Sequence, residues 1–300
     1  MKEWFRNYGK VSFVIFLFSV GLLSVVFLIS SLQPTKLKVS FLDIGQGDAI
    51  LIQTPSGHTM LIDGGPTNKI LEKLSQHMNY FDTDIDVIVA THPDADHVTG
   101  LIPVLEKYNV HTILISKAES KTGVFADLTK HIEEEKADVH VAETNDELDF
   151  HDGVIAKVLY PSKNYIAKKN DTNDASVSME IIYGDETFLL TGDLPSKEEG
   201  KLISALSSLR QSRESADSNI TVYKAGHHGS KTSSGETLLK YIKPEYSVIS
   251  AGVNNKYGHP NQETITRLEK YSKEILSTIT HGTISFITDG RLMKVETTLR

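Results

Sequence analysis

A short polar segment, "THPDADH" at residues 91–97, directly follows the apolar run "IDVIVA", which predicts a buried strand. Alternate side chains of an extended chain point the same way, so His92 and Asp94 can converge on one ion. Asp96 and His97 stand where the chain turns into a predicted helix, and they can reach a second ion nearby. The simpler alternative is that Asp96 caps this helix. Four side chains of metal-ligand type at one strand end favour a metal site.

Two further strand ends supply residues of the same kind. "FLLTGD" ends in Asp193, which we expect to bridge two ions, although a turn aspartate is the alternative. "VYKAGHHGS" presents His227 and His228 after another apolar run. Strand alternation would point only one of the pair inward, and the choice leans to His228.

The first 35 residues differ from the rest of the chain. Lys2, Arg6 and Lys10 precede "VSFVIFLFSVGLLSVVFLIS", and no charge occurs from Val11 through Thr35. Twenty apolar residues at about 1.5 Å each would span a hydrocarbon core of about 30 Å. We therefore predict a cytoplasmic N-terminus at 1–10, a transmembrane anchor at 11–32 and a domain at 37–300 outside the cell.

A cleaved signal peptide, followed by secretion, is the rival interpretation of this segment. It is less favoured because signal peptides have an apolar region of about 7–15 residues and a cleavage site of the A-x-A type.

The remaining chain is acidic and mixes strands with helices. Residues 36–300 contain 28 Lys and Arg against 38 Asp and Glu, a net charge near −10, so electrostatics alone would not hold nucleic acid. The chain has no cysteine, which excludes disulfides and thiolate ligands. Helices are expected near 68–79, 97–108, 124–136, 196–210, 237–242 and 262–272, with strands between them. Two such halves predict an α+β fold, an αββα sandwich of two packed sheets with helices outside.

Seven blocks in this order resemble a known family: "LDIGQGDAILI", "MLIDGG", "THPDADHVTGL", "NDASVSM", "LLTGD", "KAGHHGSKTSS" and "NNKYGHP". They resemble the metallo-β-lactamase-fold domain of the competence DNA-uptake protein ComEC, from about Lys38 to Gly290. The resemblance implies an αββα sandwich with its site at one edge. It also implies that Asp63 is a buried structural or supporting residue, and Asp43 and Asp48 are interpreted as structural too.

Two departures from the wider superfamily shape the predicted metal site. The superfamily motif is His-x-His-x-Asp-His, whereas the second histidine is here Asp94. A further histidine ligand is common before the bridging aspartate, yet none occurs from Asp152 through Lys224, so Asn173 or water is expected there. Oxygen ligands favour harder cations. We expect two divalent ions, Zn²⁺ or Mn²⁺ with Mg²⁺ as a third option.

Such a pair of ions suits hydrolysis of a phosphodiester. Two ions about 3.5–4 Å apart generate hydroxide and clamp the oxygens of an in-line displacement. Asp96 would orient the attacking water, and His259 would donate a proton to the leaving group. The polar segments near the site offer substrate contacts, although a loop role is the alternative for each: Asn173, Asp174, Ser176, Ser230, Lys231 and Asn254.

By resemblance, the leading substrate is DNA, and the acidic domain favours a short single strand. A single span cannot form a DNA channel, so transport is not implied. Two alternatives stay open: a phosphocholine-type esterase or lactonase on the same fold, and a membrane-tethered accessory protein that binds metal without turnover.

Overall fold

The computed structural model describes residues 12–25, 36–79, 81–167, 171–212 and 220–299, and the chain divides into two units, Met1–Thr35 and Lys36–Arg300. Residues 12–25 form a helix with exposed apolar side chains. No helix within the described ranges has the length and apolar character needed to cross a bilayer. The predicted N-terminus at 1–10 and the predicted span beyond residue 25 lie outside the described residues, so the anchor stays a prediction.

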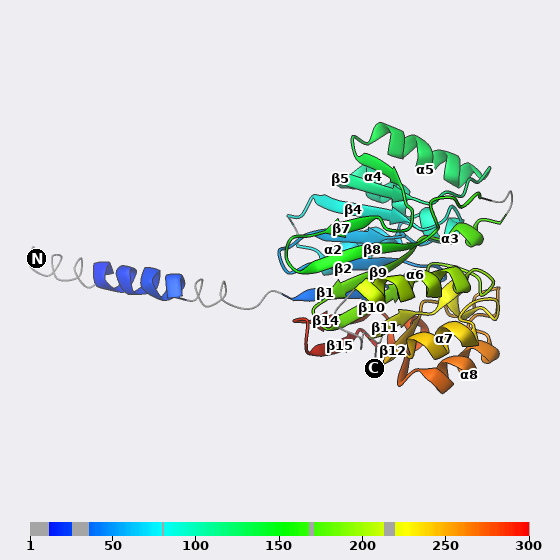
Figure 1. Cartoon of the computed structure of the whole chain (residues 1–300). Helices are drawn as coiled ribbons and strands as arrows, with labels where there is room; N and C mark the ends of the chain where they lie inside the picture. Colours follow the sequence, from blue (N-terminus) through cyan, green and yellow to red (C-terminus); the bar gives the residue numbers. More distant parts are fainter. Residues whose placement is uncertain (1–11, 26–35, 80, 168–170, 213–219, 300) are drawn as a thin grey trace, which may run out of the picture. The chain divides into compact units, whose positions relative to one another are not determined.

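The second unit contains two sheets (Figure 1). Within the described residues, the first sheet has eight strands in the order β15-β14-β1-β2-β3-β4-β5-β6. Its strands are β1 (Leu37–Phe41), β2 (Ile50–Gln53), β3 (Thr59–Ile62), β4 (Asp84–Ala90), β5 (Asn109–Ile115), β6 (Asp138–Val141), β14 (Ile284–Thr288) and β15 (Met293–Thr297). β3 to β6 pair in parallel, so their carboxyl ends share one edge.

The second sheet has seven strands among the described residues, in the order β13-β12-β11-β10-β9-β8-β7. They are β7 (Glu147–Asp149), β8 (Val154–Tyr160), β9 (Ser178–Tyr183), β10 (Glu186–Leu190), β11 (Val222–Lys224), β12 (Tyr246–Ile249) and β13 (Glu274–Ser277). β9 and β10 form a hairpin, and β10 to β13 pair in parallel.

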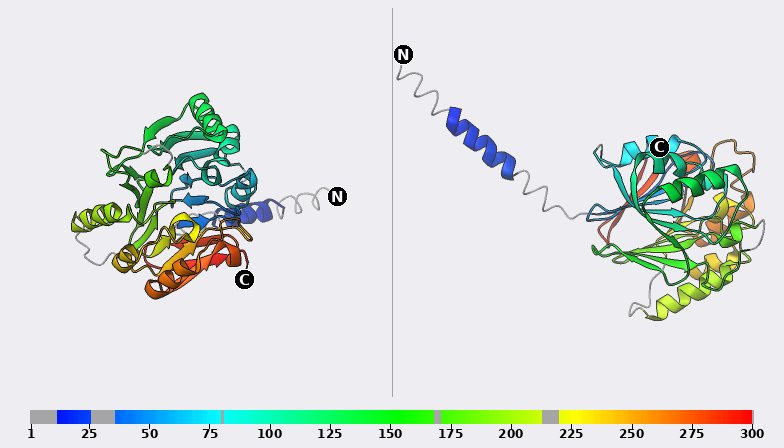
Figure 2. Two further views of the ribbon diagram at one scale, coloured as in Figure 1. Left: turned by 90° about the vertical axis from the view of Figure 1, so that its right-hand side faces the viewer. Right: turned by 90° about the horizontal axis from the view of Figure 1, so that it is seen from above.

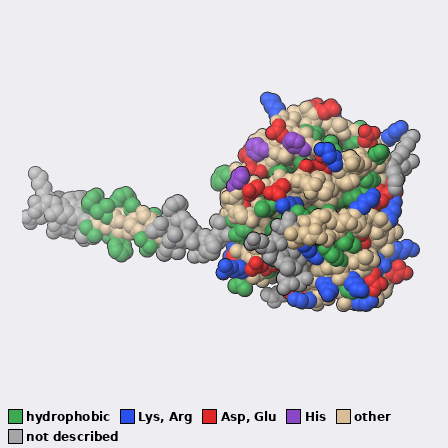
Figure 3. All heavy atoms as spheres, viewed as in Figure 1, with side chains coloured by type: hydrophobic (Ala, Val, Ile, Leu, Met, Phe, Trp, Pro, Cys, Tyr) green, Lys and Arg blue, Asp and Glu red, His purple; other side chains and the backbone are tan. Residues whose placement is uncertain are grey.

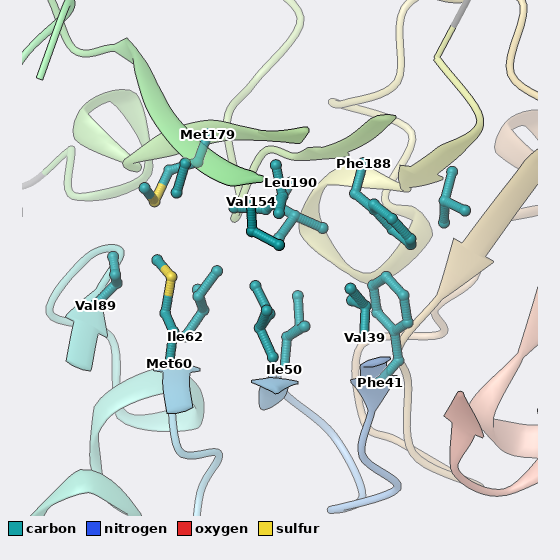
Figure 4. Packing of buried hydrophobic residues seen from close by; sticks show 14 of the residues in the cluster. Val39, Phe41, Ile50, Met60, Ile62, Val89, Val154, Met179, Phe188 and Leu190 are labelled. Carbon is teal, nitrogen blue, oxygen red and sulfur yellow. The ribbon is translucent and has the colours of Figure 1, made fainter. Parts of the chain in front are cut away.

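Alternating apolar residues let each sheet be buried on both faces. Ile50 and Ile52 of β2 face the other sheet, whereas Leu51 belongs to the cluster beneath the helices. Figure 4 shows the two inner faces meeting, with Phe41 and Ile50 from one sheet opposite Phe188 and Leu190 from the other. This packing confirms the predicted sandwich of two sheets.

Helices cover both outer faces. α2 (Lys69–His77), α3 (Ala95–Val98), α4 (Leu101–Lys107) and α5 (Gly123–Glu134) pack on the first sheet. α6 (Glu199–Ser212), α7 (Glu236–Ile242) and α8 (Gln262–Tyr271) pack on the second, and a short α9 (Thr278–His281) follows β13. In Figure 1, α4 and α5 lie at the top of the domain and α7 and α8 at the bottom, and the left view in Figure 2 shows the same separation.

The helix predicted at 97–108 is broken into α3 and α4, and a close backbone approach explains the break. A Cβ on Gly100 would lie 1.9 Å from the carbonyl oxygen of Gly64. The Gly64 amide donates to the carbonyl oxygen of His97 at 2.7 Å. The break therefore ties His97 to the loop that carries Asp63.

A buried carboxyl at the start of α6 makes stability depend on pH. Glu199 is 4% exposed and accepts from the Gly235 amide at 2.9 Å. Burial raises its pKa to about 7, against the lowering effect of the amides of Gly235 and Ser234 and the charge of Arg267. A carboxyl with a raised pKa stabilises the fold below the unfolded value of 4.5, and this contribution is lost as pH rises through about 7.

We therefore expect Glu199→Gln to gain up to about 3 kcal/mol relative to the wild type at pH 8 compared with pH 4.5. Urea unfolding at both pH values, with chelator present, measures this difference. Glu263→Gln on the exposed side of α8 is the control. An equal effect of Glu199→Gln at both pH values would show that the carboxyl titrates normally.

Candidate metal centre

Four buried side chains from distant parts of the chain form a cluster that can hold a metal ion. Asp48 lies in the loop after β1, His97 in α3, Asp193 after β10, and His228 in a 3-10 turn, η2 (Gly226–Gly229), after β11. One ligand atom of each lies within 4.8 Å of the others. Both sheets therefore contribute to the site, as the sequence predicted.

The carboxylate of Asp193 is the centre of this cluster. Its Oδ2 lies 3.3 Å from His97 Nε2, 3.5 Å from His228 Nε2, 3.7 Å from His227 Nε2 and 3.9 Å from His92 Nε2. This oxygen therefore faces four imidazole nitrogens and can bind a metal ion together with them.

The imidazoles lie close to one another and to the two aspartates of the motif. His92 Nε2 lies 3.8 Å from Asp94 Oδ2, and this buried nitrogen has no hydrogen-bond partner among the described residues. His228 Nε2 lies 3.3 Å from His97 Nε2 and 3.4 Å from Asp96 Oδ2. The rings of His92 and His97 have centroids only 4.1 Å apart, so the residues of "THPDADH" form one continuous cluster with His228.

Neither aspartate of the motif is used for capping. α3 begins at Ala95 with Asp94 at the N-cap position, and no side-chain capping hydrogen bond forms. Asp96 lies inside the first turn, so the capping alternative for this residue is wrong. Instead, Thr172 donates to Asp94 Oδ1 at 2.6 Å, which holds that carboxylate beside His92.

Asp63 supports the cluster through the ring nitrogen of His97 that does not face Asp193. Its Oδ2 lies 2.7 Å from His97 Nδ1 and accepts from Thr91 Oγ1 at 2.6 Å, while Oδ1 accepts from the Thr91 amide at 2.8 Å. A carboxylate on Nδ1 orients the ring and leaves Nε2 free to bind an ion. This contact agrees with the supporting role that the resemblance implied.

Both histidines of the His227–His228 pair approach Asp193, although strand alternation predicted only one. The backbone is not extended here: His227 has φ 50° and ψ 49°, and His228 has φ 55° and ψ 28°. Two successive non-glycine residues in the left-handed region cost about 1–3 kcal/mol each and are usually found at functional sites. His228 is buried and contacts the Ser250 carbonyl through Nδ1 at 3.0 Å, whereas the ring of His227 is 29% exposed.

A buried lysine is the residue that sequence reasoning missed. Lys224 is fully buried, forms an ion pair with Asp48, lies 3.5 Å from Asp193 Oδ1 and donates to the Gly192 carbonyl at 2.9 Å. Asp48 in turn lies 3.5 Å from His228 Nδ1. Asp48 was interpreted as structural, yet it contacts the site directly. Asp43 instead bonds the turn amide of Gly45 at 3.3 Å.

The electrostatics keep the central carboxylates ionised. Burial alone would raise the pKa of Asp193, but the charges of His228, His97 and Lys224 outweigh it and lower that pKa well below its usual range. The same competition lowers the pKa of Asp96 to about 2, through a hydrogen bond from His228 and the charges of His97 and His228.

The imidazoles differ in protonation. Burial and the neighbouring His97 lower the pKa of His92 to about 3, so its lone pair is free at neutral pH. Despite burial, Asp193 and Asp48 raise the pKa of His228 to about 9, and Asp193 and Asp63 raise that of His97. A divalent cation would therefore displace protons from His97 and His228. Imidazole nitrogens and carboxylate oxygens are the donors that Zn²⁺ and Mn²⁺ accept, so the residues fit such ions.

The residues predicted to contact substrate do not all face the cluster. Asn173 Nδ2 lies 3.4 Å from His227 Nδ1, beside the cluster. Asp174 is buried and pairs with Lys197 at 2.7 Å, and Ser176 Oγ accepts from the Asp193 amide at 3.2 Å. These two side chains support the site instead of facing an opening.

The other predicted contacts lie in the loops beyond η2. Ser230 Oγ lies 3.0 Å from Thr232 Oγ1, Lys231 is exposed and its amide donates to Asn261 at 2.8 Å, and Asn254 is exposed with φ 55°. His259 is closer to the cluster, with its ring centroid 5.3 Å from that of His227. Burial, His227 and His228 lower the pKa of His259, so the neutral ring predominates at pH 7.

The fold and the cluster define a class: an αββα metallo-β-lactamase-type domain with a metal site where strands of both sheets end. Comparison with known proteins agrees, because residues 42–165 match the metallo-beta-lactamase superfamily. Residues 42–165 are therefore similar to a metallo-β-lactamase domain, and members of that superfamily are in general metal-dependent hydrolases.

Among the similar proteins are two relatives from competence systems. The chain is 27% identical to ComE operon protein 3 of Bacillus subtilis over 266 residues, 83% of this chain and 33% of that protein. It is 29% identical to competence protein ComA of Neisseria gonorrhoeae over 249 residues, 83% of this chain and 32% of that protein. The chain thus spans about a third of the length of these relatives. This confirms the resemblance to the ComEC-type domain.

A solved structure shows the same fold. The metallo-beta-lactamase fold protein YhfI from Bacillus subtilis superposes with a TM-score of 0.53 at 11% identity, covering 84% of this chain and 100% of that one. At this identity the likeness concerns the fold alone.

Proposed function

We propose that this protein is a metal-dependent phosphodiesterase that acts on DNA or a smaller phosphodiester outside the cell, tethered by its N-terminal segment. The observation that supports it most is the position of Asp193 Oδ2, within 3.9 Å of four imidazole nitrogens. In this proposal, His92, Asp94 and His227 would hold one ion, Asp96, His97 and His228 would hold a second, and Asp193 would contribute to both. Asn173, the residue expected where the chain lacks a histidine before Asp193, lies 3.4 Å from His227 Nδ1 and positions that ring.

Two divalent cations supply Lewis acidity toward a phosphoryl oxygen and lower the pKa of a bound water. The chain's own groups do the rest. Asp96, whose carboxylate is 26% exposed, orients the attacking water. His259 hydrogen-bonds the leaving oxygen through a ring N–H, and its lowered pKa keeps the ring in the neutral form at pH 7, so few molecules carry the imidazolium that was expected from the sequence as proton donor.

The competence relatives support a phosphodiester as the substrate class, and the charge of the domain limits its size. Figure 3 shows basic and acidic side chains interspersed on the face in view. With a net charge of −8 for the whole chain, binding depends on contacts close to the metal centre. A short single strand or a small diester fits better than a long duplex.

The test uses the full chain, stripped of metal and reloaded with Mn²⁺ or Zn²⁺. We expect cleavage of bis-p-nitrophenyl phosphate and single-stranded DNA that depends on the metal and falls at least about 100-fold in Asp96→Ala. Asp185→Ala, an exposed aspartate in the turn at the opposite end of β10, is the matched control. A protein that holds two ions per chain without turnover would favour the accessory alternative, and hydrolysis of choline esters alone would favour the esterase.

A further inference from the structure

A cavity of about 620 Å³ adjoins the candidate metal centre. Its lining includes Asp94 and Asp96 together with Lys256 and Tyr257 of the loop before His259. The two aspartates are the more exposed carboxylates of the centre, at 41% and 26%. A group bound in this cavity therefore lies next to whatever reacts at the metal centre.

The walls of the cavity suit a flat apolar group that carries an anion. Pro66 and Pro93 form part of the lining, and the Tyr257 ring is 51% exposed. Lys256 Nζ lies 5.0 Å from the centroid of that ring. The Lys256 ammonium group thus lies over one face of the Tyr257 ring.

The loop is held in place before any ligand binds. The Asn255 side chain accepts from the amides of Tyr257 at 3.1 Å and His259 at 3.0 Å, and donates to the Gly252 carbonyl at 2.9 Å. The Gly252 amide donates to Gln46 Oε1 at 3.2 Å, which fixes the loop against the segment after β1. A preorganised platform loses little entropy on binding.

Aromatic rings connect this platform to the metal centre. The Tyr257 and His259 rings stack with centroids 5.9 Å apart and planes at 22°, and His259 meets His227 edge-on at 5.3 Å. The tyrosine is therefore the outermost of a row of rings that begins beside Asp193.

We propose that this cavity binds the nucleoside attached to the phosphate at the metal centre, with the base stacked on Tyr257 and Lys256 contacting the next phosphate. The proposal rests on the proposed phosphodiesterase activity and specifies its substrate as a nucleotide diester. Stacking on an aromatic face accepts every base. A choline headgroup fits worse, because it needs several aromatic faces and Lys256 already places a cation beside the one ring present.

Two substrates with the same leaving group test the proposal. The p-nitrophenyl ester of thymidine 5′-phosphate carries a base, and methyl p-nitrophenyl phosphate does not. We expect the full, metal-loaded chain to prefer the nucleotide, and Tyr257→Ala to reduce the ratio of the two kcat/KM values roughly 5- to 150-fold, the equivalent of one stacked base. Tyr257→Phe keeps the ring and should keep the ratio. Phe81→Ala, an exposed aromatic before β4, is the control.

Binding without turnover separates this proposal from the proposed function. Calorimetry compares thymidine 5′-phosphate with deoxyribose 5-phosphate. Tighter binding of the nucleotide that disappears in Tyr257→Ala supports the subsite. Equal binding of both, with cleavage of both diesters intact, overturns the subsite and leaves the phosphodiesterase standing. Failure of both ligands to bind, together with no cleavage, overturns both.

Discussion

Replacement of Asp193 with alanine is expected to abolish metal-dependent turnover and to leave the protein with fewer than two ions per chain. Loss of a residue that only supports a metal ligand lowers affinity or activity about 10–100-fold. Asp193 Oδ2 faces four imidazole nitrogens, so the loss of activity in Asp193→Ala should exceed about 100-fold. Elemental analysis of the reloaded protein and the rate of diester cleavage measure the two effects.

A second variant separates the effect of the charge of Asp193 from the effect of its shape. Asp193→Asn keeps the volume but removes the anion that faces His97, His228 and Lys224. We expect it to bind metal as poorly as the alanine variant, whereas Asp185→Ala should match the wild type. If both Asp193 variants retained two ions and full activity, Asp193 would be a turn residue and the two-ion site would need another bridge.

Much of the fold could be predicted because local patterns agree with it. Apolar runs bounded by glycine and proline predicted β4, β10 and β12, and helical periodicity predicted α2, α5 and α8. The pairing partner of the last hairpin, β14–β15, could not be predicted in this way. β14 pairs with β1 across some 240 residues of chain, through contacts such as Val39 with Phe286 that no local pattern encodes. β13 is short and half exposed, so its pattern was too weak to notice.

In the candidate site, too, some residues could be predicted from local sequence and others depend on the whole fold. Residues grouped in "THPDADH" and at strand ends could be proposed from their types and spacing, and the structure brings them together. Lys224 was missed because a lysine at the end of "ITVYK" has the pattern of a solvated strand end, and only the fold places Asp48 beside it. The approach of both His227 and His228 depends on left-handed backbone angles, which no alternation rule anticipates.

Lys224→Met is expected to lower the free energy of unfolding of the metal-free protein by about 3–5 kcal/mol. Lys224 is fully buried, and its removal leaves the equally buried carboxylate of Asp48 without its cation. Methionine fills a similar volume, so the loss reports on charge and not on a cavity. Urea unfolding in the presence of chelator is the measurement, because a bound metal ion would itself compensate Asp48.

The double variant Lys224→Met with Asp48→Asn distinguishes an unpaired charge from poor packing. Removal of the unpaired carboxylate of Asp48 should restore a large part of the free energy of unfolding lost in Lys224→Met. The effects of the two substitutions will therefore not add. Lys294→Met is the matched control, since its partner Glu296 lies 2.7 Å away at the surface and such exposed pairs contribute about 0–1 kcal/mol. A loss below about 1 kcal/mol in Lys224→Met would mean that the buried lysine does not balance the acidic side of the centre, and that the imidazolium rings of His97 and His228 suffice.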